Sequence, residues 1–411
     1  MNDPFAPADA ATPVVSAFYD RFPYPGDPLQ DGPPPGYNWR WCVDAVTAAT
    51  RGALPSAPRA WRILDAGCGT GVSTDYLCHL NPGATVLAVD ISGGALQVAR
   101  ERTRRSGAGS AVAELRLEQR SLLDLQGEGP FDYINSVGVL HHLNKPIAGL
   151  RALADRLADN GLLHLFLYAD AGRWEIHRTQ RALNLLDVGH GEQGLQLGRR
   201  LLAELPAENR LRRHHEQRWA LDTAADANFA DMYLHPQETS YTLERLFALI
   251  EACDLQFAGF SNPAVWDPAR LLQGDLLERA RRMPERQRWA LVEALDPEIS
   301  HFEFFLSRGE VARRDWSEDR ELLAASAVRS PCLWGWPSTS LLGRDLEPLT
   351  IDAEDLLLVK ALEESGRGTS LAELTVDLPP EDRASRARRL VEQGVLLLVA
   401  SAGRHGALKP S

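Results

Sequence analysis

Short hydrophobic runs alternate with amphipathic helical stretches between Trp61 and Ala169. Five runs are rich in β-branched and other apolar residues, and they read WRILDAG, TVLAVD, LRLEQR, FDYINSV and LLHLFLY. Between the first two, apolar side chains recur at helical spacing at Val72, Leu77 and Leu80. Strands that alternate with helices in this way predict a parallel β-sheet with helices on its faces.

Two more strands are expected after a long helical interval. Residues 170–233 are polar and helix-rich with no strand pattern, so we expect a helical insertion over the edge of the sheet. A helix over 240–255 follows, and the runs LQFAGF and HFEFFLSR then read as strands. The predicted fold class is therefore α/β, with a doubly wound, seven-stranded sheet.

The segment before the sheet, from Phe18 to Trp41, is expected to be an irregular arm. It contains seven aromatic residues and six prolines, which are too many helix breakers for one continuous helix. It either packs as a lid edge on the core or forms a wall over a ligand site, because loops carry function and aromatic faces can hold cations.

A small unit is expected at the C-terminal end of the chain. Beyond Gly309, a linker rich in Trp and Pro leads to three predicted helices over 353–366, 370–374 and 379–394, followed by the strand VLLLVA. Ser370 and Glu373 form a capping box for the middle helix. We therefore divide the chain into an arm with a lid helix (1–60), a sheet domain (61–309) and a small C-terminal domain (310–411).

Composition narrows the classes of partner. At 411 residues the chain is too long for one hydrophobic core, and its net charge of -12 disfavours nucleic acid and anionic membranes. The first residues lack the apolar core of a secretory signal, and no run of 18 uncharged apolar residues occurs. Five cysteines without a CxxC pair suit reduced thiols, so we expect a cytoplasmic protein and assign no metal.

The most specific motif lies between the first strand and the next helix. Three glycines at alternate positions, Gly67, Gly69 and Gly71, allow a tight turn and a close approach of a flat ligand. The dinucleotide fingerprint is not met, because Val72 stands where its third glycine belongs, and no Gly-Lys-Ser/Thr phosphate loop follows. By itself, the glycine triplet is weak evidence.

Two carboxylates at neighbouring strand ends strengthen this motif. Asp90 ends the second strand, 21 residues beyond Gly69, where it could accept both hydroxyls of a ribose. Asp124 follows the third strand, where it could meet an adenine amino group. Ligands of open α/β sheets bind at the carboxyl ends of strands, so a nucleoside cofactor is the economical interpretation.

The runs LDAGCGTG, VLAVDIS, SLLDL and FDYINSVGVLHHL, followed by NGLLHLFLY, resemble the class I S-adenosylmethionine-dependent methyltransferases in order and spacing. The resemblance spans about Trp61 to Tyr168 and implies a Rossmann-like methyltransferase sheet that binds S-adenosyl-L-methionine. The last two strands look like the antiparallel pair that closes this family's sheet. The C-terminal unit loosely resembles winged-helix-like modules that serve some bacterial methyltransferases in regulation, peptide binding or dimerisation.

The resemblance also implies the residues that contact the cofactor. Asp65 and the three glycines would line its methionine part, Asp90 would hold the ribose and Asp124 would meet the adenine. The full set implied for cofactor binding is Asp65, Gly67, Gly69, Gly71, Asp90, Ile91, Leu123, Asp124 and Ser136. From the residues alone, Asp65 could instead cap the turn, and Asp124 could be a helix N-cap.

The end of the fourth strand bears on the acceptor. No Asn-Pro-Pro-Tyr type motif is present, and members with the Val-Leu-His-His ending mostly act on small molecules, which is implied by resemblance alone. His141 or His142 could be a general base, and His141 is our candidate; both could instead only hydrogen-bond to loop backbone.

Aromatic and histidine side chains outside the sheet are candidates to enclose the acceptor. They are Tyr19, Tyr24, Tyr168, Trp174 and His177, with Tyr233 and His235 as similar cases. Each could equally serve core or lid packing.

We therefore expect methyl transfer to an oxygen, nitrogen or sulfur nucleophile of a small molecule. The alternatives are methylation of a peptide or protein side chain, with the C-terminal unit as docking site, and a cofactor-binding regulator without turnover. A homodimer through the C-terminal unit is left open. Four arginines on its last helix are outnumbered by five acids between Ser370 and Gly394, which disfavours DNA binding.

Overall fold

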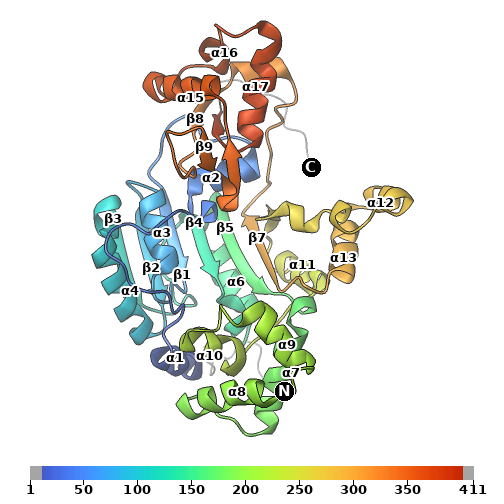
Figure 1. The fold of residues 1–411 in the computed structure, drawn as a ribbon. Helices are drawn as coiled ribbons and strands as arrows, with labels where there is room; N and C mark the ends of the chain where they lie inside the picture. The colour runs from blue at the N-terminus through green and yellow to red at the C-terminus, as the bar shows by residue number, and fades with distance from the viewer. Residues whose placement is uncertain (1–11, 401–411) are drawn as a thin grey trace.

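A seven-stranded sheet forms the centre of the molecule (Figure 1). The computed structural model describes residues 12–400, so the acidic, proline-containing start of the chain lies outside the described residues. The strand order is β3-β2-β1-β4-β5-β7-β6, which confirms the predicted α/β fold class. The strands are β1 (Arg62–Ala66), β2 (Thr85–Asp90), β3 (Glu114–Gln119), β4 (Phe131–Val137), β5 (Leu157–Tyr168), β6 (Gln256–Phe260) and β7 (His301–Ser307).

The first five strands run parallel, and β7 pairs antiparallel with both β5 and β6. Strands covered on both faces read as nearly continuous hydrophobic runs, as β1 and β2 do. Because parallel strands place their carboxyl ends at one edge of the sheet, the turns after β1, β2 and β4 lie together there.

Helices cover both faces of the sheet. One face packs against α6 (Pro146–Ala154), α11 (Leu243–Glu251) and α13 (Glu285–Leu295), and the other packs against α2 (Val43–Arg51) and α3 (Val72–Leu80). Helix α4 (Gly93–Ser106) begins where the Ser92 side chain accepts a hydrogen bond from the Ala95 N–H. Beside α13, helix α12 (Gly274–Arg281) projects from the body in Figure 1.

The stretch after β5 folds as helices that lie below the carboxyl edge of the sheet in Figure 1. They are α7 (Trp174–Leu185), α8 (Glu192–Glu204), α9 (Arg210–His214) and α10 (Asp226–Leu234). Their apolar side chains share a core with Phe18 and Phe22 of the N-terminal segment. That segment begins with α1 (Thr12–Arg21), so Phe18 and Tyr19 are helical, and the irregular arm we expected starts only after α1.

The C-terminal unit is more extensive than the sequence indicated. The expected linker contains α14 (Asp319–Ala324), β8 (Ser326–Arg329), β9 (Ser340–Leu342) and β10 (Pro348–Thr350). The three expected helices form as α15 (Ala353–Ser365), α16 (Leu371–Leu374) and α17 (Pro380–Glu392), and β11 (Leu396–Val399) pairs antiparallel with β8. The capping box of Ser370 and Glu373 forms as predicted.

This unit contacts the sheet domain at the edge where the strands begin. Leu54, just before β1, forms a bridge with Val399, and the Trp316 indole donates a hydrogen bond to the Gly52 carbonyl at 2.7 Å. In Figure 1 the unit and the helices after β5 accordingly lie at opposite ends of the sheet. No helix of residues 12–400 has the length and hydrophobicity needed to cross a bilayer.

Candidate active site

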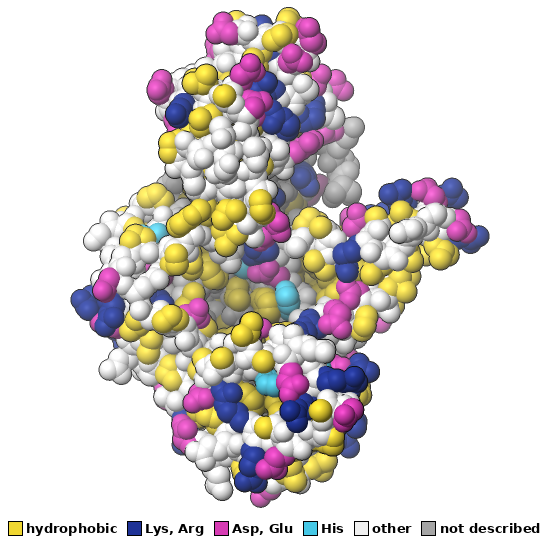
Figure 2. Space-filling view, in the orientation of Figure 1, with side chains coloured by type: hydrophobic (Ala, Val, Ile, Leu, Met, Phe, Trp, Pro, Cys, Tyr) yellow, Lys and Arg dark blue, Asp and Glu magenta, His cyan; other side chains and the backbone are white. Residues whose placement is uncertain are grey.

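A cavity of about 220 Å³ opens at the carboxyl ends of β1, β2 and β4. Its wall comes from the glycine turn, from the ends of β2, β3 and β4, and from the N-terminal segment. The residues that line it are Val15, Tyr19, Tyr24, Pro25, Trp41, Gly67, Cys68, Gly69, Val72, Ser73, Val89, Asp90, Ile91, Ala95, Arg120, Ser121, Leu122, Val137, Gly138, Val139, His142 and Leu143. Figure 2 shows that the molecule is hollowed between the body of the sheet and the lower helices, with hydrophobic side chains around the hollow.

Two glycines of the turn line the cavity, and neither position admits a larger residue. A Cβ at Gly67 would lie 2.4 Å from Val139 Cγ2, and one at Gly69 would lie 2.3 Å from the Tyr24 carbonyl oxygen. Both have positive φ angles, +83° and +53°, which side chains rarely adopt. Gly71 is instead the N-cap of α3 with φ +82°, beside Ala99 and outside the cavity wall.

Asp90 is placed as expected at the end of β2, on the cavity wall. Its Oδ2 accepts the Gly69 N–H and its Oδ1 accepts the Ser92 N–H, both at 2.8 Å. Burial raises the pKa of the carboxyl, while these two hydrogen bonds oppose that rise. The carboxylate is thus fixed beside Ile91 with lone pairs left over for a ribose diol.

Asp65 does not face the cavity, contrary to the role that the resemblance implied. It is buried, its Oδ2 accepts the hydroxyls of Ser73 and Thr74, and its Oδ1 accepts the Asn135 amide at 2.8 Å. Burial raises the pKa of this carboxyl, against those hydrogen bonds. Asp65 therefore joins β1, α3 and β4 beneath the glycine turn. This structural role is similar to the alternative given above, in which Asp65 caps the turn.

The region after β3 meets the cavity through other residues than those implied. Arg120, Ser121 and Leu122 line the wall, whereas Leu123 and Asp124 do not. Arg120 also donates to the Asp124 backbone carbonyl and so closes this loop. The sequence run RSLLDL located the loop correctly, but the turn at Ser121, where the Asp124 N–H bonds the Ser121 carbonyl, decides which residues face inward.

Ser136 is also a supporting residue. It is fully buried, and its hydroxyl donates to the Ala66 carbonyl at 3.1 Å, joining β4 to β1. No contact between its side chain and the cavity is found among the described residues.

The two histidines after β4 have different environments. His141 is sealed in the protein, with neither ring nitrogen hydrogen-bonded to any described residue, and its ring stacks on Tyr168 at 3.8 Å. Burial, with the charges of His142 and Arg173, lowers the pKa of His141 well below its usual value. His142 lines the cavity, and His141 does not.

Only two of the five aromatic and histidine candidates reach the cavity wall. Tyr19 and Tyr24 line it, from α1 and the arm. Tyr168 lies behind His141, Trp174 is 47% exposed away from the cavity, and His177 contacts Glu238 at 3.3 Å. The ligand-wall interpretation of the arm is thus the one that its geometry supports.

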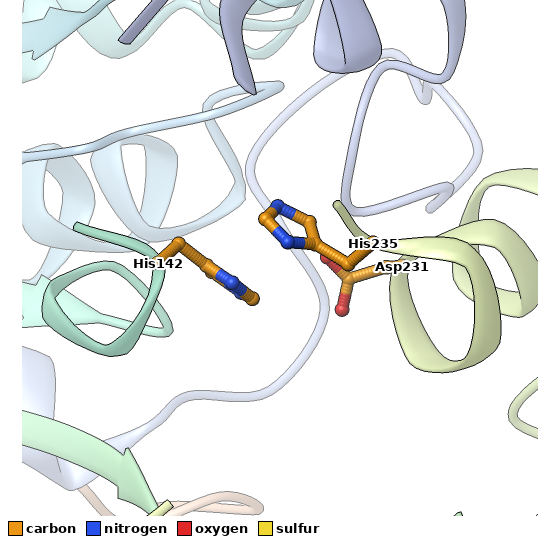
Figure 3. A group of neighbouring side chains, drawn as sticks. All are labelled: His142, Asp231 and His235. Carbon is orange, nitrogen blue, oxygen red and sulfur yellow. The ribbon is translucent and has the colours of Figure 1, made fainter. Parts of the chain in front are cut away.

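Helix α10 contributes a carboxylate that the sequence did not reveal. Asp231 is buried, and its oxygens accept the hydroxyls of Tyr19 at 2.8 Å and Tyr168 at 3.3 Å. Figure 3 shows Asp231 and His235 reaching from one segment toward His142 on another, and one ligating atom of each lies within 4.8 Å of the others. Asp231 and His235 are four residues apart, but their distance from His142 in the chain concealed the cluster.

The cavity fits the cofactor that the resemblance implied. The turn at Gly67 and Gly69 leaves a bare backbone cradle, and the Asp90 carboxylate lies at its rim beside apolar Ile91 and Leu122. A carboxylate acceptor between apolar surfaces suits a nucleoside whose base is flat and whose ribose has two hydroxyls.

Comparisons with known proteins identify the domain that contains most of this cavity. A family model described as a methyltransferase domain matches residues 64–163. An uncharacterized protein of Synechococcus sp. is 48% identical over 398 residues, which cover 95% of this chain and 94% of that protein. The uncharacterized phycocyanin operon protein W of Pseudanabaena tenuis is 51% identical over 106 residues, 26% of this chain and 94% of that protein.

More distant proteins share the sheet domain or the whole fold. A ubiquinone biosynthesis O-methyltransferase of Xanthomonas campestris is 33% identical over 141 residues, which cover 34% of this chain and 52% of that enzyme. The structure of PKMT2 from Rickettsia typhi in complex with AdoHcy superposes with a TM-score of 0.57 at 16% identity, covering 89% of this chain and 77% of that one. The chain belongs to the family of the Synechococcus protein, and it is a class I methyltransferase that uses S-adenosyl-L-methionine.

Proposed function

We propose that this methyltransferase acts on an oxygen, nitrogen or sulfur nucleophile of a small molecule. The observation that supports the proposal is the shape of the cavity, which runs from the cofactor cradle at Gly67 to Tyr19 and His142. Its outer wall is the arm, which packs against the helices after β5. A space walled on these sides suits a small acceptor.

The chain's own residues would mainly position the reactants. The cofactor supplies a methyl group on a sulfonium, which is already activated for transfer. Asp90 and the glycine turn hold the nucleoside end, while Tyr19, Tyr24 and Val139 fill the space around the acceptor and exclude water. Positioning of this kind can lower the activation barrier by about 7–11 kcal/mol. A general base such as His142 would raise the rate by about 10²–10⁴-fold.

The test is to incubate the full chain with methyl-labelled cofactor and a cell extract, and to separate small molecules from protein. Label in the small-molecule fraction that is strongly reduced in a matched sample with the Asp90→Ala variant is the expected result. Label on protein alone would contradict the small-molecule proposal. We also place the enzyme in the cytoplasm, because all five cysteines are buried free thiols.

A second candidate is methylation of a protein side chain. It is supported by the C-terminal unit, which has a hydrophobic core of its own and exposes the apolar side chains of Leu357 and Val376. Peptide docking, or a dimer, would then use the winged-helix-like C-terminal unit. In Figure 1 that unit lies at the other end of the sheet from the helices after β5, but its Asp345 pairs with Arg40 at 2.5 Å, next to Trp41 of the cavity wall. A protein bound to the unit would have to extend along the arm to reach the cavity.

Two exposed apolar side chains of the C-terminal unit distinguish these candidates. Leu357 and Val376 are 65% and 59% exposed, so Leu357→Asp and Val376→Asp should leave the fold intact. Unchanged labelling of the small-molecule fraction supports the first candidate. Loss of label from a protein fraction, with unchanged cofactor affinity, supports docking through this unit.

A further inference from the structure

The hydroxyl hydrogen of Tyr19 is engaged in a hydrogen bond within the protein and is not free to bind a ligand. Tyr19 lines the cavity and donates its hydrogen to Asp231 Oδ1 at 2.8 Å, so its oxygen can only accept a hydrogen bond from a ligand. Tyr168 donates to the other carboxylate oxygen at 3.3 Å. Burial, with the charge of Asp231, raises the pKa of both phenols well above the usual value, so both stay donors at neutral pH.

His142 is restricted in the same sense. Its Nδ1 lies 2.8 Å from the Gln237 carbonyl oxygen, which can only accept, so Nδ1 carries the hydrogen. In the neutral ring, Nε2 then has only a lone pair to offer. The Gln237 amide also donates to the His142 carbonyl at 3.1 Å, and its backbone N–H donates to His235 Nδ1 at 3.1 Å, which fixes both rings.

A metal site at the same cluster fits these contacts less well. Tetrahedral zinc ligands at 2.0–2.2 Å from the ion lie roughly 3.3–3.6 Å apart, and here one ligating atom of each residue lies within 4.8 Å of the others, which is a looser grouping than zinc requires. Both Asp231 oxygens accept phenol hydrogens, and Nδ1 of both His142 and His235 is engaged with Gln237. These hydrogen bonds leave two atoms that can only accept, the Tyr19 oxygen and His142 Nε2, on side chains that line the cavity, while His235 Nε2 has no hydrogen-bond partner among the described residues.

We infer that Tyr19 and His142 select a methyl acceptor whose reacting group carries a hydrogen, such as an amide, an amine, an alcohol or a phenol, and reject a carboxylate. The inference rests on the proposed function and names the chemical class of its acceptor. A carboxylate has no hydrogen to donate to the Tyr19 oxygen or to His142 Nε2, and the Asp231 charge behind Tyr19 would repel it.

The same arrangement accounts for the proton released in the reaction. The acceptor atom forms its bond to the methyl carbon as the carbon–sulfur bond breaks, and that bond's electron pair stays on sulfur. The acceptor's hydrogen leaves as a proton to His142 Nε2, which releases it to solvent. Asp231 touches neither reactant, so it is a positioning residue that acts through Tyr19.

Acetamide and acetate test the inference, because they have nearly the same shape and only acetamide has hydrogens to donate. Each is titrated by NMR into the full chain loaded with S-adenosylhomocysteine. Acetamide should bind at least tenfold more tightly than acetate. Tyr19→Phe should weaken acetamide about three- to tenfold, the usual effect of one neutral hydrogen bond.

Asp231→Asn separates positioning from a purely structural role. An asparagine amide can donate to the Tyr19 oxygen and turn its hydroxyl toward the cavity, so the ratio of the two affinities should fall toward one. Damage to the fold would weaken both probes and leave the ratio unchanged, which would contradict the role of Asp231. The matched control is Tyr76→Phe, which removes a hydroxyl bonded to the Pro35 carbonyl and should keep the wild-type ratio.

The cofactor separates failure of this inference from failure of the proposed function. If S-adenosylhomocysteine binds and acetate matches acetamide, or neither probe binds, the inference is wrong and the proposed function stands. If S-adenosylhomocysteine does not bind, the proposed function fails first. Probe binding that EDTA abolishes and Zn²⁺ restores would identify a metal site and overturn the inference.

Discussion

At the scale of single residues, one carboxylate can serve the fold and the ligand together. Asp90 fixes the glycine turn through the Gly69 N–H and the start of α4 through the Ser92 N–H, and it still faces the cavity. Asp124, which the sequence favoured equally, lies outside the wall. We therefore expect substitution of Asp90 to weaken cofactor binding and substitution of Asp124 to leave it nearly unchanged.

Asp90→Ala should raise the Kd for S-adenosylhomocysteine about 10- to 100-fold. The reason is the loss of hydrogen bonds to a charged group, which contribute about 1.5–3 kcal/mol. Asp124→Ala is the matched control and should change the Kd less than about twofold, within the usual range for residues without such contacts. Isothermal calorimetry measures both Kd values. An equal rise in Kd for the two variants would mean that Asp124 also contacts the cofactor.

A chain of buried polar side chains joins the strands beneath the cavity. The Asn135 amide donates to Asp65 Oδ1, His164 bonds Asn135 Oδ1 at 2.8 Å and Glu303 Oε1 at 3.2 Å, and Arg40 Nε pairs with Glu303 Oε2 at 2.6 Å. Burial alone would raise the pKa of Glu303. The His164 hydrogen bond, with the charges of His164 and Arg40, outweighs burial and lowers that pKa to about 2.

Glu303→Gln should therefore lower the free energy of unfolding at neutral pH, by on the order of 3 kcal/mol. A depressed carboxyl pKa stabilises the fold fully above its unfolded value near 4.5, and this contribution is lost as the pH falls through about 2. The difference between wild type and variant should accordingly narrow in acid. Urea unfolding from neutral pH down to about 3 tests this, and a pH-independent difference would contradict it.

At the scale of elements, the turn between β1 and α3 depends on its close approach to the loop after β4. Gly67 and Val139 come from different turns, and the contact leaves no room for a Cβ. The glycine pattern predicted a tight turn. The spacing could not show that the loop after β4 leaves no room for a side chain at Gly67.

Gly67→Ala should reduce stability by about 1–3 kcal/mol more than Gly83→Ala, and it should weaken cofactor binding. Both glycines have positive φ, +83° and +77°, so both substitutions are strained. Only Gly67 has an atom within 4 Å of the added Cβ, so the difference isolates the clash with Val139. Thermal unfolding of the pair tests it, and equal losses would mean that Val139 moves aside.

Elements far apart in the chain also explain which site residues the sequence missed. Tyr19 and Asp231 are 212 residues apart, and only the packing of α1 on α10 brings their side chains together. The helical pattern predicted helices after β5, but it did not show which face meets the arm. His141 and His142 were indistinguishable in sequence, because only the turn after β4 decides which ring faces the cavity.

At the scale of the whole molecule, the C-terminal unit has its own hydrophobic core and a small apolar contact with the sheet domain. Leu54 is buried against Leu397 and Val399 of β11. This contact lies at the edge where the strands begin, and the cofactor cradle lies at the other edge. Removing residues 310–411 would expose Leu54, so point substitutions are the cleaner test of the unit.

Leu54→Ala should lower the free energy of unfolding by about 2–5 kcal/mol, as for other large-to-small changes in a core. Leu221→Ala is the control, because Leu221 is 91% exposed, and it should change stability by less than about 0.5 kcal/mol. Denaturant unfolding measures both. The Kd for S-adenosylhomocysteine should stay the same in both variants, and a large change with Leu54→Ala would reveal coupling between the two edges.

The sequence by itself determined the sheet, its helices and the glycine turn, because hydrophobic periodicity and backbone freedom are local properties that recur in each βα unit. It also determined Asp90, whose position at a strand end follows from the same pattern. Only the tertiary structure decided that Asp65 supports the turn, that His142 faces the cavity and that Asp231 orients Tyr19. Those roles depend on side-chain direction and on contacts between distant segments, which no local pattern records.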